Sequence, residues 1–339
     1  MNTRIRFLIL AAASAWAVFA QDPPYPASAY TLACDESSRQ QSGLGSDLWQ
    51  LTLGPDGRLY AVWGEGWGWN RQRNDQKRGF GVTRITSRPG SLKAEDLWDY
   101  GPGWGVYRPL SLIFANDALY LFWKKGAGRY REDATHLAFS ADLGRTWDTG
   151  EYRRFTGIPA GLMVSGVVQG ESSEYVYVYF ARSQGSDFYL ARVPRGEIES
   201  FASYRWFAGG DRWTESFDGT KPVFHDPNGY LWHIGVSYIA PLGRYLLTKP
   251  HYTPHDNPAA TQAPESGLSS LGVFEAPTPW GPWTTVHYED DFLDDKAKFS
   301  YFIPTPWVSA DGREFWLTYS GRPEYASFNL IRCRLGDGE

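Results

Sequence analysis

The chain has 339 residues, with 33 Lys and Arg against 38 Asp and Glu, so its formal net charge is −5. A mildly acidic chain is a poor candidate for binding nucleic acids or anionic membranes. Aromatic residues make up 17% of the chain and include 16 Trp and 21 Tyr. Such side chains fill protein cores, and they also stack on the apolar faces of sugar rings.

The first twenty residues have the pattern of a secretory signal peptide. Arg4 and Arg6 form a short basic start, and an apolar stretch over 7–20 leads to an expected cut after Ala20. Cleavage removes these two positive charges and moves the net charge from −5 to −7. We predict a secreted or periplasmic protein with one domain over 21–339. We expect no membrane insertion, because no later stretch approaches ~18 uninterrupted apolar residues.

Short apolar and aromatic runs alternate with clusters of Gly, Pro, Asp and Asn, which is typical of many strands joined by tight turns. One motif, a turn followed by a strand rich in Leu, Val, Tyr and Trp, recurs five times. Its copies occupy 54–63, 116–123, 174–180, 226–235 and 310–319. We predict an all-β fold, a five-bladed β-propeller with four strands in each blade, because a β-sandwich would explain the strands but not their recurrence.

The two cysteines lie near opposite ends of the mature chain. Cys34 ends a strand pattern over 29–34, and Cys333 lies in the last strand pattern, 328–335. The N-terminal pattern can supply the strand that the last blade lacks, which would leave no open sheet edge. In an oxidising compartment we expect Cys34 and Cys333 to pair and to lock this closure. Two separate buried thiols are the alternative.

Residues 140–147 match the Asp-box pattern Ser-x-Asp-x-Gly-x-Thr-Trp at every fixed position. In such a hairpin turn Asp142 can accept backbone N–H groups, Gly144 permits a positive φ, and Trp147 packs beneath the turn. We assign these three residues a structural role, because Asp boxes occur in sialidases and in many other propellers. Sialidase chemistry itself fits less well, since only one box is visible and no arginine cluster can be assembled.

Further segments match a known pattern in order along nearly the whole mature chain. They are 47–49, 56–66, 108–112, 175–179, 190–194, 242–247, 274–283, 309–312 and 329–332. Together they resemble a family of secreted five-bladed propellers long described as a domain of unknown function, some of whose members are endo-D-arabinofuranases. The resemblance implies a polysaccharide partner, with furanosides such as arabinan among the candidate substrates. The chain departs from the family pattern at 64–66, where Gly-Glu-Gly replaces Gly-Asp-Gly and moves the carboxylate by more than ~1 Å.

Glycoside hydrolysis needs two carboxyl groups across the scissile bond, one protonated and one ionised. Asp47 lies between a Gly-rich entry and an apolar strand, and we assign it the role of base or nucleophile. Glu65, followed by Trp67 and Trp69, is the candidate general acid, because apolar surroundings raise the pKa of a carboxyl group. Asp187, in a loop that leads into a strand, is a third catalytic candidate. Each could instead be an ordinary turn or loop carboxylate.

Aromatic and cationic side chains near these acids are the candidate substrate contacts. We assign Trp49, Trp67 and Trp69 to sugar binding, although such rings could merely pack. Arg108 and Lys221 each precede a Pro at the start of a strand pattern. If these are inner strands, both cations face the central channel and bind sugar hydroxyls or an acidic substituent. Alternatively, they neutralise the two leading acids as structural ion pairs.

Three histidines complete the set of candidates. His251 and His255 lie in a Pro-rich loop and are expected to be exposed and to line a groove, with His251 assigned to substrate binding. His233 lies in an apolar strand pattern and is expected to be a core residue. We expect no metal, because the Pro between His251 and His255 opposes a helical pair of ligands. We also expect no cofactor, since no phosphate-binding glycine loop is present.

Two functions remain open from the sequence: a glycoside hydrolase, and a non-catalytic carbohydrate-binding propeller with the same aromatic surface. Two carboxylates about 5–9.5 Å apart would favour the enzyme. Carboxylates fully engaged by Arg108 and Lys221 would favour the binding protein. A protein-interaction scaffold, a third reading, would present a flat apolar face instead. We expect a monomer whose partner is a poly- or oligosaccharide.

Overall fold

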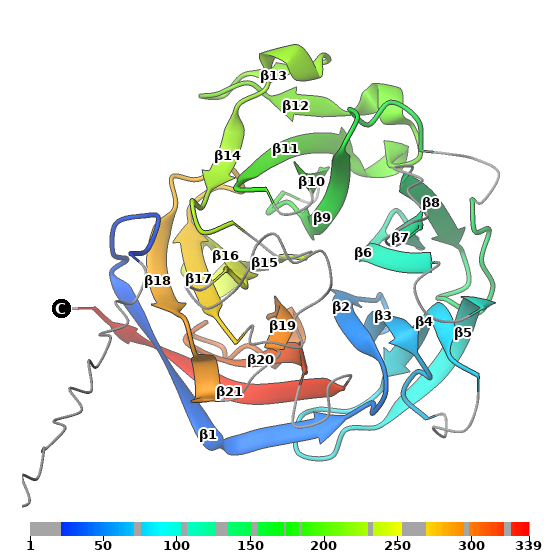
Figure 1. The fold of residues 1–339 in the computed structure, drawn as a ribbon, viewed down its shortest axis with the longest axis horizontal. Helices are drawn as coiled ribbons and strands as arrows, with labels where there is room; N and C mark the ends of the chain where they lie inside the picture. The colour runs from blue at the N-terminus through cyan, green and yellow to red at the C-terminus, as the bar shows by residue number, and fades with distance from the viewer. Residues whose placement is uncertain are drawn as a thin grey trace, which may run out of the picture.

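The computed structural model describes residues 22–70, 76–102, 107–126, 135–150, 155–172, 174–182, 185–229, 233–252, 269–294, 298–321 and 327–338. Their strands form five antiparallel sheets arranged around one axis (Figure 1). The five-bladed β-propeller expected from the recurring motif is therefore confirmed.

The blades follow one another in chain order. The first contains β2 (Asp47–Leu53), β3 (Leu59–Gly66), β4 (Arg78–Ile85) and β5 (Ala94–Pro102). The second contains β6 (Tyr107–Ala115), β7 (Ala118–Lys125) and β8 (Thr135–Ser140). The third contains β9 (Leu162–Gln169), β10 (Tyr175–Arg182), β11 (Asp187–Pro194), β12 (Arg205–Phe207) and β13 (Trp213–Thr214), and β14 (Pro222–His225) pairs with β11.

The remaining two blades share the chain ends. The fourth contains β15 (Gly235–Ile239), β16 (Arg244–Lys249), β17 (Leu271–Ala276) and β18 (Thr284–Glu289). The fifth contains β19 (Lys298–Phe302), β20 (Glu314–Gly321), β21 (Phe328–Asp337) and β1 (Tyr30–Ser42). The described residues also form the short 3-10 turns η1 (Arg195–Glu197), η2 (Phe201–Ser203), η3 (Phe217–Gly219), η4 (Ala240–Leu242), η5 (Phe292–Asp294) and η6 (Thr305–Trp307). Among the described residues, no helix has the length and apolarity needed to cross a bilayer.

The first strand of each blade lies at the axis. Strands β2, β6, β9, β15 and β19 each contact the first strands of both neighbouring blades, and Figure 1 shows them around the centre. Because antiparallel strands alternate in direction, these inner strands begin on the same face on which the second strands of the blades end. We call this the start face. Residues that begin an inner strand therefore meet there, although they lie far apart in the sequence.

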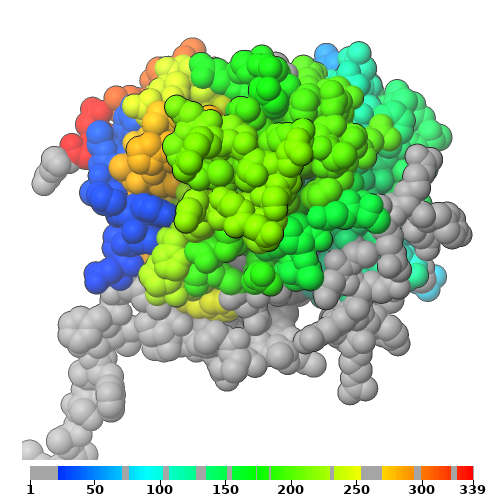
Figure 2. Space-filling view, turned by 90° about the horizontal axis from the view of Figure 1, so that it is seen from above, coloured from blue at the N-terminus to red at the C-terminus, as the bar shows by residue number. Residues whose placement is uncertain are grey.

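The third and fourth blades differ from the expected repeat. Four copies of the motif form second strands, but copy 226–235 runs from the end of β14 towards the start of β15. This copy does not form a second strand, because β16 takes that place in the fourth blade. The extra strands β12–β14 belong to the third blade, which faces the viewer in green in Figure 2. The second blade has three strands in the described part of the chain, not four.

Most of the aromatic side chains fill the space within and between the blades. Trp49, Trp63, Trp123 and Trp206 are all fully buried. Trp123 of β7 packs against Phe80 of the first blade, with ring centroids 5.6 Å apart. The high aromatic content is thus largely explained by packing between the blades, because aromatic side chains bury more apolar area than smaller side chains do.

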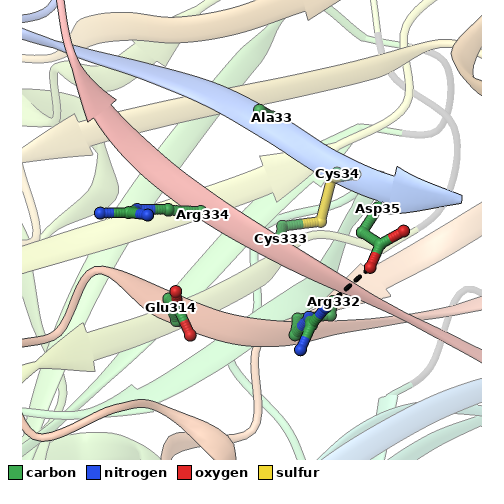
Figure 3. Close-up of a pocket in the computed structure, with 7 residues that line it drawn as sticks. All are labelled: Ala33, Cys34, Asp35, Glu314, Arg332, Cys333 and Arg334. Carbon is green, nitrogen blue, oxygen red and sulfur yellow. Dashed lines mark hydrogen bonds and ion pairs between the residues drawn. A yellow bond between two sulfur atoms is a disulfide. The ribbon is translucent and has the colours of Figure 1, made fainter. Parts of the chain in front are cut away.

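The ring is closed by pairing between the two ends of the chain. Strand β1 pairs with β21 from Tyr30 opposite Asp337 to Ser42 opposite Phe328. The predicted disulfide between Cys34 and Cys333 is present and joins these two strands (Figure 3). It borders a depression of about 350 Å³. The prediction that an N-terminal strand completes the last blade is confirmed: β1 covers the edge of β21 and becomes the outer strand of that blade.

Residues 140–147 form a turn after β8. The Asp142 carboxylate accepts hydrogen bonds from the backbone N–H groups of Arg145 (3.1 Å) and Thr146 (2.9 Å). Hydrogen bonding, chiefly from the Thr146 hydroxyl, lowers the pKa of Asp142 to about 2. Gly144 has a φ of +86°, and the Trp147 indole donates to its carbonyl oxygen over 3.1 Å. The carboxylate is therefore engaged by its own turn.

We predict that the double variant Cys34→Ala, Cys333→Ala loses about 2–5 kcal/mol of unfolding free energy. The disulfide closes a loop over a sequence separation of 299 residues, so its removal restores much conformational freedom to the unfolded chain. Denaturant unfolding of variant and wild type checks this, and reduced wild type should match the variant. Equal midpoints for oxidised wild type and variant would contradict the prediction.

Candidate functional site

Asp47 and Glu65 come together at the start face of the first blade. Asp47 begins the inner strand β2 and pairs with Gly64, the residue before Glu65 in β3. Both carboxyl residues are buried, with 6% and 9% of their surfaces exposed. The ladder is irregular between Asp47 and Gln50, and a β-bulge of this kind redirects side chains at the strand end. The hairpin therefore brings together two acids that are not neighbours in the sequence.

The backbone at this site is strained. Leu48, directly after Asp47, has a φ of +60°, and Glu65 has a φ of +49°. Residues other than glycine rarely adopt such backbone angles. These angles persist only where the surrounding packing enforces them. A Cβ atom on Gly66 would lie 2.1 Å from the Ser46 hydroxyl oxygen and 2.2 Å from the Gly45 carbonyl oxygen. The glycine after Glu65 is therefore needed for this close approach.

Arg108 joins the pair from the second blade. It lies at the start of the inner strand β6, as predicted, and its Nη2 atom lies 2.9 Å from Glu65 Oε1. Both side chains are largely buried, with 18% and 10% of their surfaces exposed. The ion pair holds the Glu65 carboxyl group against the guanidinium group and fixes its position.

Asp47 has a contrasting environment. Within the described part of the chain its Oδ1 atom is buried and has no hydrogen-bond partner. Burial, followed by the charge of Glu65, raises the pKa of Asp47 to about 8, against the opposing charges of Arg108 and Lys77. At neutral pH Asp47 therefore keeps its proton beside the second carboxyl group. A buried acid that holds its proton next to a second acid is an arrangement suited to acid–base chemistry.

His233 reaches the same region from the fourth blade. Its Nε2 atom lies 3.2 Å from the carbonyl oxygen of Pro109, the neighbour of Arg108. Burial lowers the pKa of His233 to about 3, so the ring is neutral and Nε2 must donate this hydrogen bond. The expectation that His233 is a core residue is confirmed, since 3% of its surface is exposed. It lies just before the inner strand β15.

Two predicted site residues lie elsewhere. Asp187 begins β11, the third strand of its blade, and its carboxylate lies 2.8 Å from His225 Nδ1 with 41% of its side chain exposed. Lys221 is exposed and directly precedes β14, which pairs with β11 rather than facing the axis. The expectation that Lys221 begins an inner strand is wrong. The structure does not bring these two residues to Asp47 and Glu65.

The three candidate tryptophans differ in their surroundings. Trp49 is completely buried, and its indole N–H donates to the Ser46 carbonyl oxygen over 2.9 Å, so its assignment to sugar binding is wrong. Trp69 packs edge-on against Trp49 with ring centroids 5.9 Å apart and belongs to the same core cluster. Trp67 is half-buried, and its ring lies 4.6 Å from the Lys77 ammonium group. Among the three, Trp67 remains the candidate for substrate contact.

His251 is not an exposed groove residue. It is completely buried, its ring stacks on Tyr288 at 3.8 Å, and Nε2 lies 2.9 Å from Asp290 Oδ1. Burial, aided by the Lys249 charge, lowers the pKa of His251 to about 2. The expected exposure of His251 is wrong, and His255 lies outside the described residues. The described residues contain no group of three or more metal-ligating side chains.

These observations define a class of protein: a five-bladed β-propeller with a buried acid pair and an arginine where its inner strands begin. More particularly, the chain belongs to the family described as "Domain of unknown function (DUF4185)", whose model matches residues 72–330. The resemblance inferred from the sequence segments is confirmed. No curated protein sequence matches the chain.

Several solved structures share the fold. A protein from Bacteroides ovatus ATCC 8483 has a TM-score of 0.57 at 13% identity, with 90% of this chain and 93% of that chain covered. An exo-beta-1,3-galactanase from Phanerochaete chrysosporium, solved with beta-1,3-galactotriose, has a TM-score of 0.55 at 14% identity, covering 86% and 64%. An endo-arabinase from Bacteroides thetaiotaomicron has a TM-score of 0.52 at 11% identity, covering 85% and 93%. At such identities the likeness concerns the fold.

We predict that Asp47→Asn stabilises the protein in a pH-dependent way. In the folded state Asp47 keeps its proton up to about pH 8, whereas in the unfolded chain it loses it above its ordinary value of 3.8. Burial of Asp47 therefore costs stability that grows between these pH values, and a neutral Asn removes this cost. The gain should be small near pH 4 and on the order of a few kcal/mol near pH 8.

Thermal or denaturant unfolding at pH 4 and pH 8 measures the gain. Asp187→Asn is the matched control, because its carboxylate is partly exposed. An equal effect of Asp47→Asn at both pH values would contradict the raised pKa.

Proposed function

We propose that this protein is a glycoside hydrolase that cleaves a polysaccharide at the start face of the propeller. The observation that carries the proposal is the pairing of a buried Asp47, whose pKa is raised to about 8, with a Glu65 carboxyl group held by Arg108. Glycosidases need one carboxyl group in each state across the scissile bond. The galactanase and endo-arabinase with the same fold support this reading.

The environments of the acids favour roles opposite to those assigned from the sequence. Asp47 is the general acid: its proton passes to the glycosidic oxygen as the bond from that oxygen to the anomeric carbon breaks. Glu65 either attacks the anomeric carbon or removes a proton from an attacking water. When Glu65 attacks the anomeric carbon, water later releases the sugar from Glu65, and Asp47 recovers its proton from that water. Arg108 positions Glu65 through their 2.9 Å ion pair.

The substrate and location belong to the same proposal. The family resemblance makes furanoside polymers such as arabinan the first substrates to test, and the endo-arabinase likeness supports this choice. A signal peptide over residues 1–20 would export the enzyme to the periplasm or the medium, where such polymers occur. We expect it to act as a monomer.

We predict that Asp47→Asn and Glu65→Gln each lower kcat by about 10²–10⁴-fold, because each removes one member of the acid–base pair. Wild-type activity should fall as pH rises through about 8, where Asp47 loses its proton. Reducing-sugar release from a panel of bacterial and plant polysaccharides measures both effects. Asp187→Asn, on an outer strand, should keep wild-type kcat.

Activity that survives both substitutions would remove this assignment. Binding without turnover by the wild type would instead indicate the alternative function, a non-catalytic carbohydrate-binding propeller. The observation that favours this alternative is the engagement of Glu65 by Arg108. Among the described residues, Asp47 Oδ1 has no hydrogen-bond partner, and this free oxygen favours the enzyme.

A further inference from the structure

Two lysines lie over aromatic rings close to the acid pair. The Lys77 ammonium group lies 4.6 Å from the centre of the Trp67 ring, and the Lys125 ammonium group lies 5.9 Å from that of Tyr107. All four side chains are partly exposed. We call Trp67, Lys77, Tyr107 and Lys125 the lysine–aromatic row. Its members come from the first two blades and lie at or beyond strand ends on the start face.

The row adjoins the acid pair on both blades. Tyr107 directly precedes Arg108, and its side chain packs against the first blade. A Cβ atom on Gly79 would lie 2.8 Å from the Tyr107 Cβ atom, and one on Gly101 would lie 2.5 Å from its ring. Lys77 lies just before β4, and its charge acts on Asp47. Trp67 follows Glu65 by two residues, and a Cβ atom on Gly45 would lie 2.4 Å from its ring. The row therefore borders the place where the two acids meet.

The two lysines differ from the neighbouring arginines in how their charges are balanced. Arg78 lies 2.5 Å from the Asp99 carboxylate, and Arg108 lies 2.9 Å from that of Glu65. Within the described ranges, Lys77 and Lys125 have no ion pair with a carboxylate and lie instead over the rings. A cation over an aromatic face gains only about 0.5–1 kcal/mol at an exposed site. Both ammonium groups can therefore turn to a bound anion at little cost.

A third lysine adds positive charge on the side of the third blade. Lys124 is opposite Arg108 in the β6–β7 ladder, and its Nζ atom lies 3.9 Å from the Met163 sulfur in β9. The whole chain has a net charge of −5, so this concentration of cations beside an active-site candidate runs against the overall charge. A neutral sugar offers hydroxyl groups, which do not require it, whereas an acidic sugar pairs with ammonium groups.

We propose that the substrate of this site is an acidic glycan, one whose sugars carry carboxylate or phosphate groups. The ammonium groups of Lys77 and Lys125 pair with the acidic groups, while the rings of Trp67 and Tyr107 contact the apolar faces of the sugars. This inference rests on the proposed glycosidase function for its chemistry. It adds a substrate class that the acid pair alone does not specify.

The test measures binding to the full-length Asp47→Asn protein, which should bind without cleaving. The probes are polygalacturonate, its fully methyl-esterified form, a phosphomannan and neutral arabinan. If the site recognises carboxylates, polygalacturonate should bind at least tenfold tighter than the two uncharged polymers. If it recognises phosphates, the phosphomannan should do so. This preference should weaken with added salt, since salt screens partly exposed charges. Equal or tighter binding of the uncharged polymers, or no binding of either acidic polymer, would overturn the proposal.

Substitutions then connect the preference to the row. Lys77→Gln and Lys125→Gln in the same background should each weaken binding of the acidic polymer by about tenfold, a loss of about 1.4 kcal/mol. The arginine variants of both should retain most of it, because they keep the charge. Lys221→Gln is the matched control, since Lys221 is exposed on the outer part of the third blade. Unchanged binding in both glutamine variants, with unfolding midpoints like that of the parent, would also overturn the proposal.

The two proposals fail in different ways. If the wild type cleaves no polymer but the Asp47→Asn protein binds the acidic one through Lys77 and Lys125, the acidic substrate class stands and the hydrolase assignment falls. If the wild type cleaves arabinan and the acidic polymers do not bind, the hydrolase stands and the acidic class falls.

Discussion

Pairing of β1 with β21 is the constraint on which the geometry at the axis depends. A propeller holds its inner strands in place because each blade is pressed between two others, and this condition fails at an open seam. Here the N-terminal strand supplies the outer strand of the blade whose other three strands come from the C-terminal end, and a disulfide joins the two. Residues before β1 extend this attachment, since Tyr25 packs against Phe224 and Phe274 of the third and fourth blades.

The closed ring allows the protein to maintain an unfavourable local arrangement. A buried carboxyl group whose Oδ1 atom has no hydrogen bond among the described residues and a glutamate at a φ of +49° both cost free energy. They persist because Gly64 and Gly66 allow close packing and because Arg108 reaches across from the next blade. The cost is connected to chemistry, since the burial that destabilises the charged form of Asp47 is also what keeps it a proton donor at neutral pH.

Aromatic residues serve two different purposes in this molecule, and local sequence does not separate them. Trp49 and Trp69 lie in the same cluster at the seam between the first and last blades, next to Phe328. Trp67 lies only two residues from Trp69, yet its ring is partly exposed beneath a lysine. Tyr107 was not a candidate from the sequence, because its significance comes from Lys125 on the adjacent strand and Gly101 on the adjacent blade.

The sequence by itself determined the elements whose signals are local. Strand alternation, turn residues and their recurrence predicted five blades, and the position of the two cysteines predicted the seam. The sequence also identified Asp47, Glu65 and Arg108. Each lies at the end of a predicted strand, and in the structure these strands lie at the axis or next to it. The tertiary structure alone decided which strand starts are inner ones. Lys221 failed this test because the third blade carries extra strands, which local patterns cannot count. Asp187 failed it because it begins the third strand of its blade. The tertiary structure also decided that His251 is buried and that the pKa of Asp47 is raised, because burial and charge come from residues brought together only by folding.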